Sequence, residues 1–139
     1  MKIHLRLLIL LLMFSGCGLG KVDPQKGQAL VENLLNDLKA ENYSSLDKYY
    51  TSSFNESEPA DKKIEKFKQL KETLGGIKSY ELTSSKENYD SDRGVNELEL
   101  KYKVTCDRLT VKETYLVIND EGETKIIFQN IENLPAKEN

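Results

Sequence analysis

Histidine and tryptophan are the residue types that this sequence most clearly lacks. The 139-residue chain has no Trp, and its single His is His4, which falls in the apolar head of the chain. Cysteine is also scarce, since only Cys17 and Cys106 are present. A domain without His has no Ser-His-Asp triad, no Cys-His pair and no His-ligated metal. We therefore expect no metal site and no cofactor, and we assign no catalytic residue.

The chain also lacks an excess of positive charge. It has 20 Lys and Arg residues against 23 Asp and Glu residues, which gives a formal net charge of −3. This mildly acidic balance argues against a nucleic-acid partner, because non-specific binding of nucleic acid depends on positive charge. A length of 139 residues predicts one domain, since domains commonly span roughly 100–150 residues.

The sequence contains no long apolar run. The longest, at residues 7–14, has eight residues, whereas a helix needs about 20 apolar residues to span a bilayer. Lys2 and Arg6 precede this run, and two small residues follow it. A positive segment, a short apolar run and small residues are typical of a signal peptide in this order. We therefore predict that residues 1–16 form a signal peptide.

The end of this segment resembles the lipobox of bacterial lipoproteins. The resembling residues are Phe14-Ser15-Gly16-Cys17, with Phe14 at a position where the family prefers Leu. In that family the chain is cleaved before the Cys, which carries a thioether-linked diacylglycerol and usually an amide-linked acyl chain such as palmitate. The resemblance implies that Cys17 is a lipid attachment site. The alternatives are an ordinary signal peptide cut near Gly16, with Cys17 incidental, and an uncleaved anchor helix.

The lipobox resemblance also implies a location. It implies a protein that is exported and lipid-anchored to the cell membrane or the outer membrane of a bacterium. Two or more acyl chains give stable membrane anchoring, whereas one chain gives only marginal binding. Residues 17–23 are then the lipidated Cys and a short tether. Residues 18–23 span at most about 20 Å, so the domain is expected to stay close to the bilayer.

Apolar residues recur at helical spacing after the tether. Asp23 and Pro24 predict an N-cap followed by Pro at the first helical position. We expect a helix over about residues 25–41 because apolar residues recur at i, i+3, i+4 and i+7. The residues of this apolar stripe are Val31, Leu34, Leu35 and Leu38.

Two more helices are expected before the pattern changes. A short helix over about residues 46–51 is followed by a loop over 55–59. Pro59 opens the third helix, and Gly75 with Gly76 ends it in the manner of a C-cap. The residues that share one face of the third helix are Ile64, Phe67, Leu70 and Leu74.

Beyond the two glycines the apolar period changes from 3.6 to 2, which indicates strands. A strand that includes Tyr80 and Leu82 leads to a turn-rich connection over residues 89–94. Residues 97–106 alternate most regularly between apolar and polar, as expected for an antiparallel strand with one buried face. Two further strands are expected over 111–118 and 125–131, with a hairpin turn at 119–122.

Helices followed by antiparallel strands indicate an α+β fold. In such folds the helices pack on one face of the sheet. We expect the N-terminal helices to pack on one antiparallel sheet. The single domain is expected to span residues 24–134, with a polar tail at 135–139.

The order of these elements resembles the nuclear transport factor 2-like (cystatin-like) roll. The resembling stretches are ALVENLLNDLKAENYSSLDKYYTSSF, KETLGGIKSYEL and the strands over residues 97–131. They also resemble small bacterial envelope lipoproteins of uncharacterised role that carry this roll. The resemblance implies a curved sheet and an apolar cone between helix and sheet. Enzymatic members such as ketosteroid isomerase use carboxylates and Tyr in that cone.

Tyrosine is the aromatic residue that could contribute to such a cone. The chain has seven Tyr, and Tyr43, Tyr49 and Tyr102 are candidates for the mouth of a ligand pocket. The alternative is that they pack in the core with their hydroxyls reaching solvent. Cys106 is either a reactive thiol or a small core side chain, and its place on an apolar strand face favours the core. No Asp is flanked by an apolar run that predicts a buried base with a raised pKa.

Three functions remain open from the sequence. The first is a membrane-anchored envelope lipoprotein that binds a small apolar ligand or an envelope protein partner. The second is a structural or accessory lipoprotein with no ligand, in which side chains fill the cone. The third is an isomerase- or dehydratase-type enzyme, which the lack of His disfavours. A cavity would separate the first two, and a buried Asp or Glu that faces it would favour the third.

Overall fold

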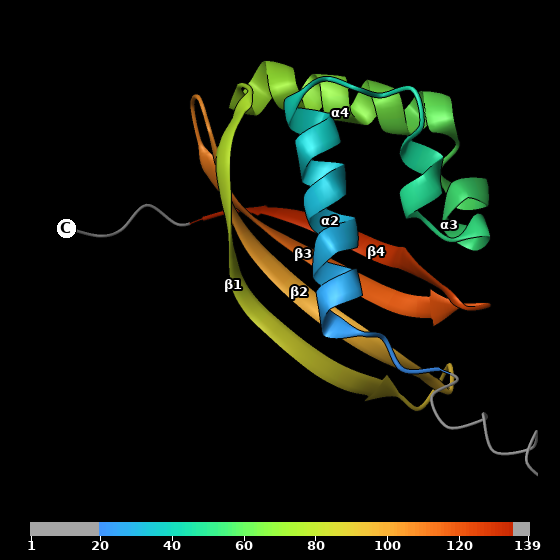
Figure 1. Cartoon of the computed structure of the whole chain (residues 1–139). Coiled ribbons are helices and arrows are strands. Elements are labelled where there is room, and N and C mark those ends of the chain that lie inside the picture. Colours follow the sequence, from blue (N-terminus) through green and yellow to red (C-terminus); the bar gives the residue numbers. More distant parts are fainter. Residues whose placement is uncertain (1–19, 135–139) are drawn as a thin grey trace, which may run out of the picture.

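The computed structural model describes residues 20–134 (Figure 1). The predicted signal peptide at 1–16, the predicted lipid attachment site Cys17 and the tail at 135–139 lie outside these residues. Within the described part, no helix is long and apolar enough to cross a membrane. The elements are α2 (Pro24–Lys39), η1 (Leu46–Tyr49), α3 (Ser52–Ser57), α4 (Ala60–Leu74), β1 (Ile77–Asp90), β2 (Val95–Cys106), β3 (Thr110–Asp120) and β4 (Glu123–Asn133).

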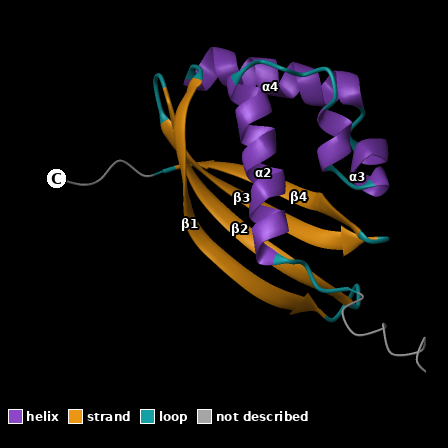
Figure 2. Cartoon of the chain, in the orientation of Figure 1, coloured by secondary structure: helices purple, strands orange, loops and turns teal. Residues whose placement is uncertain are grey.

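The four strands form one antiparallel sheet in the order β1-β2-β3-β4. The sheet is curved, and the helices lie on its concave side (Figure 2). α2 runs across this concave face, and α4 lies over one end of it (Figure 1). The expected α+β fold, with N-terminal helices packed on a curved antiparallel sheet, is therefore confirmed.

The inward face of the sheet follows the predicted alternation. Leu98 on β2 pairs with Val117 on β3, and Leu100 pairs with Tyr115, and all four side chains are buried. Residues two apart in a strand point to the same face, so this register brings the apolar sides of both strands together. Among residues 20–134, the buried apolar residues form one cluster, whose members run in sequence from Val22 to Ile126. A chain that begins at Gly18 therefore keeps this cluster.

α2 forms where the sequence predicts it and ends two residues earlier. The side chain of Asp23 accepts a hydrogen bond from the backbone N–H of Gln25 at 2.9 Å, and Pro24 occupies the first turn. An Asp N-cap satisfies N–H groups that have no partner within the helix. The helix approaches the sheet closely at Gly27, where an added Cβ would lie 2.5 Å from Cδ2 of Leu98.

The segment between α2 and α4 differs from its prediction. The loop expected over residues 55–59 is wrong in part, because α3 occupies Ser52–Ser57. The short helix before it is a 3-10 helix, η1, over Leu46–Tyr49. The Thr51 side chain caps α3 by accepting a hydrogen bond from the N–H of Phe54 at 3.3 Å.

A buried lysine explains why this short helix forms. Lys63 on α4 is 1% exposed, and its Nζ donates to Oδ1 of Asn55 at 2.6 Å and to the carbonyl of Glu58 at 2.7 Å. Its Nζ also lies 2.8 Å from Oδ1 of Asp47. A buried charge is tolerated only when it is paired and hydrogen-bonded. These contacts join η1, α3 and α4, and they depend on residues that are distant in sequence.

The strands are longer than the sequence predicts. β1 continues to Asp90, so the connection predicted from residue 89 is shortened to 91–94. The Asp90 side chain accepts hydrogen bonds from the N–H groups of Asp92 and Arg93, which orders this turn. The β3–β4 turn lies within the predicted 119–122.

Two glycines take up backbone conformations that other residues avoid. Gly122 has φ +87° in the β3–β4 turn, next to Glu121 at φ +51°, as a type I′ hairpin requires. Gly75 ends α4 with φ +84° and ψ 176°, a region that is essentially confined to glycine. The predicted stop of the third helix is confirmed. An added Cβ at Gly75 would lie 2.5 Å from Cβ of Asp107.

These two glycines give a matched test of the helix end. At Gly122 an added Cβ meets nothing within 4 Å, so we expect Gly122→Ala to cost about 1 kcal/mol through backbone conformation alone. We expect Gly75→Ala to lower the free energy of unfolding by about 2–4 kcal/mol, because it adds a clash with Asp107 to a similar backbone cost. Urea unfolding of both variants measures the difference. Equal losses would show that the contact with Asp107 is not limiting.

Candidate functional site

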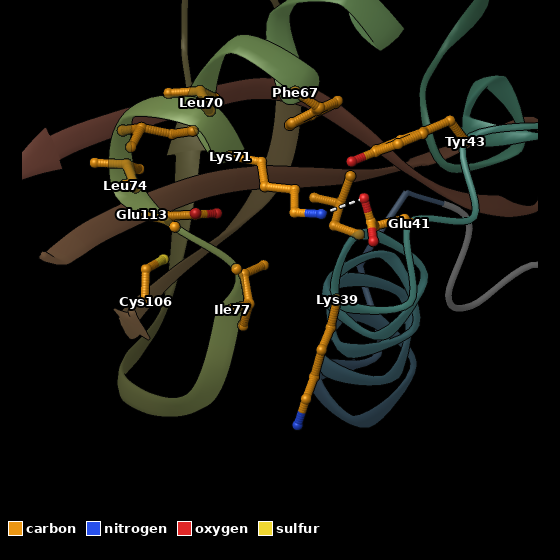
Figure 3. A pocket seen from close by; sticks show the side chains of 14 residues that line it. Lys39, Glu41, Tyr43, Phe67, Leu70, Lys71, Leu74, Ile77, Cys106 and Glu113 are labelled. Atoms are coloured by element: carbon orange, nitrogen blue, oxygen red, sulfur yellow. Dashed lines mark hydrogen bonds and ion pairs between the residues drawn. The ribbon is translucent and has the colours of Figure 1, made fainter. Parts of the chain in front are cut away.

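The structure contains a small cavity where α2 and α4 end above the sheet (Figure 3). Its volume is about 50 Å³, which leaves room for a few water molecules or a slim chemical group. Its mouth lies between the last turns of the two helices and the first residue of β1. The apolar residues that line it are Leu38, Phe67, Leu70, Leu74, Ile77 and Ile131.

A carboxylate lies at the base of this apolar cavity. Glu113 projects from the inward face of β3, where it pairs with Tyr102 on β2 and with Ile131 on β4. The residue is only 5% exposed, and Figure 3 shows its carboxylate directed toward the cavity. Burial raises the pKa of Glu113 to about 7. Hydrogen bonds from Tyr115 and Gln129 and the charge of Lys66 lower this pKa by smaller amounts. A carboxyl group with this pKa changes its charge near neutral pH.

The carboxylate is the end of a chain of polar side chains across the sheet. The Tyr115 hydroxyl donates to Oε2 of Glu113, and the Gln129 amide donates to the Tyr115 hydroxyl at 3.3 Å. The Tyr50 hydroxyl in turn donates to Oε1 of Gln129 at 2.7 Å. Buried polar groups are normally paired in this way. The chain fixes the position of the Glu113 side chain.

The second carboxylate oxygen of Glu113 is different. The amide of Gln129 lies close enough to lower the pKa of Glu113 by hydrogen bonding. No described residue, however, donates to Oε1 with normal geometry, and no described Lys or Arg forms an ion pair with Glu113. Among residues 20–134, every fully buried side-chain oxygen has a hydrogen-bond partner. Oε1 is therefore open to the cavity. It is available to a donor that enters from outside.

Cys106 lines the same cavity and is 7% exposed. Burial, followed by the negative charges of Glu113 and Asp107, raises the pKa of its thiol. Arg108 does not offset this, because its guanidinium donates to the backbone carbonyls of Glu72 and Thr73 at the end of α4. A protonated thiol is a poor nucleophile. The side chain is therefore a small core residue, as the sequence favours.

The mouth of the cavity carries an ion pair. Lys71 on α4 pairs with Glu41, which follows α2, and both side chains are largely exposed (Figure 3). The Glu41 side chain raises the pKa of Lys71 by accepting its hydrogen bond. Lys39 extends away from the other labelled residues. Exposed ion pairs contribute little stability, so the pair can open without a large cost.

The three tyrosines that the sequence suggests do not lie together at this mouth. Tyr43 lines the cavity. The Tyr49 hydroxyl instead donates to Oδ2 of Asp37 at 2.5 Å. Burial is the main cause that raises the pKa of Tyr49, and the hydrogen bond to Asp37 raises it further. Tyr102 is fully buried, with its hydroxyl 3.5 Å from Oε1 of Glu32. Of the three, only Tyr43 contributes to the cavity.

The sequence analysis does not find Glu113, although a signal for it is present. A search for Asp flanked by apolar residues misses it, because both of its neighbours in sequence are polar. In a strand the relevant neighbours are two residues away. Val111, Tyr115 and Val117 share its face, and all three are buried. A Glu at an inward position of a regular strand is therefore the signal of this site.

Comparisons with known proteins do not assign the site. No protein-family model, no curated protein and no solved structure matches this chain. Within the described residues, no group of three or more His, Cys, Asp or Glu side chains is arranged to hold a metal ion. The site is therefore defined by its geometry, a small apolar cavity with one open carboxylate oxygen.

The buried carboxyl group predicts an unusual dependence of stability on pH. Its pKa is about 7 in the folded protein, above the ordinary value near 4.3 for an unfolded chain. The folded state therefore holds the proton more tightly between these values, and its stability falls as pH rises through them. We expect this group to cost about 3 kcal/mol above pH 7 relative to pH 4. Glu113→Gln should remove this loss.

The measurement is urea unfolding of both proteins at pH 5, 6, 7 and 8. The stability of Glu113→Gln relative to the native protein should rise with pH and level off above pH 7. Glu87→Gln is the matched control, because Glu87 is exposed on β1 and forms no ion pair with any described residue. It should show no such trend. A pH-independent difference for Glu113→Gln would mean that the carboxyl group is not desolvated.

Proposed function

We propose that this protein is a lipid-anchored bacterial envelope protein that binds a small ligand in the cavity between α2, α4 and the sheet. The observation that carries this proposal is the open Oε1 of Glu113 at the base of an otherwise apolar cavity. Ligand sites typically combine apolar walls with a few placed polar groups. A protein whose core only supports its fold gains nothing from a buried, incompletely paired carboxylate.

The direction of the tether supports ligand entry from the aqueous phase. Val22 is buried at the start of α2, and Gly20 lies near Asn96 at the β1–β2 end of the sheet. The cavity lies at the opposite end of α2, beside Leu38. A helix of 16 residues is about 24 Å long. A lipid on Cys17 would therefore hold the membrane at one end of the domain, with the mouth of the cavity at the other.

A second candidate function is a proton-transfer enzyme of the isomerase or dehydratase type. It is favoured by Glu113, because a general acid or base works best with a pKa near the working pH. It is less well supported than binding. At the mouth of the cavity Lys71 pairs with Glu41, Lys39 extends away from the other labelled lining residues (Figure 3), and the Cys106 thiol is protonated. Within residues 20–134, no second group that lines the cavity is positioned to stabilise a developing charge.

The anchor is tested by lipid labelling. We expect the full chain, expressed in a bacterium, to incorporate radiolabelled palmitate and to fractionate with membranes. Cys17→Ser should abolish both, because it removes the sulfur that forms the thioether. Cys106→Ser is the matched control and should keep the label, since Cys106 is a buried core residue. Palmitate label that persists in Cys17→Ser would exclude Cys17 as the attachment site.

The ligand is tested by native mass spectrometry of residues 18–139 after incubation with a bacterial envelope extract. We expect a reproducible adduct of small-molecule mass on the native protein. Cys106→Met should reduce this adduct, because its longer side chain extends into the cavity. Leu109→Met is the control, because Leu109 is exposed, and it should leave the adduct unchanged. A clean protein mass would favour an accessory lipoprotein with no ligand.

A further inference from the structure

The chemistry of the cavity restricts the ligand that it can hold. Its walls are apolar, and its base presents one oxygen of a carboxylate whose other oxygen is already hydrogen-bonded to Tyr115. An open carboxylate oxygen in apolar surroundings needs a hydrogen-bond donor, and a charged donor makes the stronger bond. A ligand carboxylate would place two like charges together in the same site. The base of the cavity therefore favours a donor, and above all a cation.

Among residues 20–134, no cation forms an ion pair with Glu113. The charge of Lys66 on α4 lowers the pKa of Glu113, but Lys66 itself pairs with Glu58 at 3.2 Å. Three other titratable groups near Glu113 carry no positive charge: Cys106 on β2, Tyr115 on β3, and Tyr50, which follows η1. The two lysines that line the cavity, Lys39 and Lys71, form no ion pair with Glu113. The carboxylate is therefore unpaired in charge within the described residues.

The charges at the entrance do little to select the ligand, whereas the size of the cavity selects strongly. Lys71 and Glu41 at the mouth neutralise each other, and the third charged residue there, Lys39, extends away from the other labelled residues (Figure 3). The volume of about 50 Å³ is well below the roughly 150 Å³ of an apolar cavity that binds benzene, so it favours a slim group over a ring system or a branched ammonium group. A primary ammonium group is the smallest organic cation that keeps three hydrogen-bond donors. A slim alkyl chain behind it can lie against the apolar residues of α2 and α4.

We propose that the cavity binds a primary alkylammonium group, or a slim chain that ends in one, with the ammonium against Oε1 of Glu113. This inference rests on the proposed ligand-binding function. The ammonium group supplies the donor and the positive charge that the buried carboxylate lacks. The alkyl chain fills the apolar part of the cavity toward the mouth, where Tyr43 and the Lys71–Glu41 pair contact water.

This assignment predicts how binding depends on pH. An alkylammonium keeps its charge between pH 6 and pH 8, so the protein group that changes is Glu113. Its pKa of about 7 makes the ionised fraction rise roughly tenfold between pH 6 and pH 8. The apparent affinity follows the fraction of protein that is competent to bind. Affinity for the amine should therefore rise about tenfold over this range, and affinity for a neutral alcohol should not.

The experiment is a titration of isotope-labelled residues 18–139 with n-butylamine, 1-butanol and sodium butyrate, followed by NMR at pH 6 and pH 8. We expect n-butylamine to shift the signals of cavity residues and to bind at least tenfold more tightly than 1-butanol at pH 8. Butyrate should not bind. Glu113→Gln, which should be at least as stable as the native protein at pH 8, should lose both the amine preference and the pH dependence.

Glu87→Gln is the matched control, because it removes an exposed carboxylate on β1 that does not line the cavity. It should keep the amine preference. Equal binding of 1-butanol and n-butylamine, unchanged in Glu113→Gln, would overturn the ammonium assignment and leave the proposed binding function standing. An absence of binding by all three probes would also overturn it, and the adduct measured from envelope extract would then decide the proposed function separately.

Discussion

The fold depends on one constraint: the curved antiparallel sheet has a single apolar face, and that face has to be covered. β2 and β3 align their buried residues in register, so the concave side presents a continuous apolar surface. α2 lies across this surface, close enough that Gly27 leaves no room for a side chain against Leu98. α4 lies over one end of it (Figure 1). The cavity occurs where the ends of both helices meet the sheet, because neither helix continues far enough to fill the space.

Two buried ionisable residues are treated differently by this fold. Lys63 has an ion-pair partner and two hydrogen-bond acceptors, and it joins three separate elements. Its role is structural, because all its donors are used. Glu113 has no cationic partner among the described residues; Tyr115 donates to one of its oxygens, Gln129 lies nearby, and a cavity lies in front of it. Its raised pKa predicts that it destabilises the folded protein at neutral pH. A buried carboxylate that is predicted to cost stability, and that has no cationic partner among residues 20–134, is better explained by function than by folding.

The sequence predicts the elements whose stabilising residues are local. The apolar stripe of α2 and the alternation of β2 are properties of continuous segments, and both elements form where expected. Gly75 ends α4 because glycine alone adopts its backbone conformation without strain. α3 was missed because it depends on Lys63, which follows it in sequence. The far half of β1 was missed because its residues are polar, and only pairing with β2 makes it a strand.

The candidate site illustrates the same limit. Tyr43, Tyr49 and Tyr102 were suggested by residue type alone, and only the tertiary structure separates the one at the cavity from the two bonded to Asp37 and Glu32. Glu113 carries a local signal, since it occupies an inward position on a strand. That signal does not reveal whether a buried partner neutralises the carboxylate, which depends on β2, β4 and α4 together.

The positions of the tether and the cavity connect the two parts of the proposed function. If the lipid is on Cys17, the mouth of the cavity lies at the end of the domain away from the bilayer, separated from the tether by about the length of α2. A ligand embedded in the membrane would then have to leave it before it could bind. An alkylammonium compound is soluble in water and reaches such a mouth by diffusion. The polarity of the ligand that Glu113 favours therefore agrees with the direction from which the cavity is open.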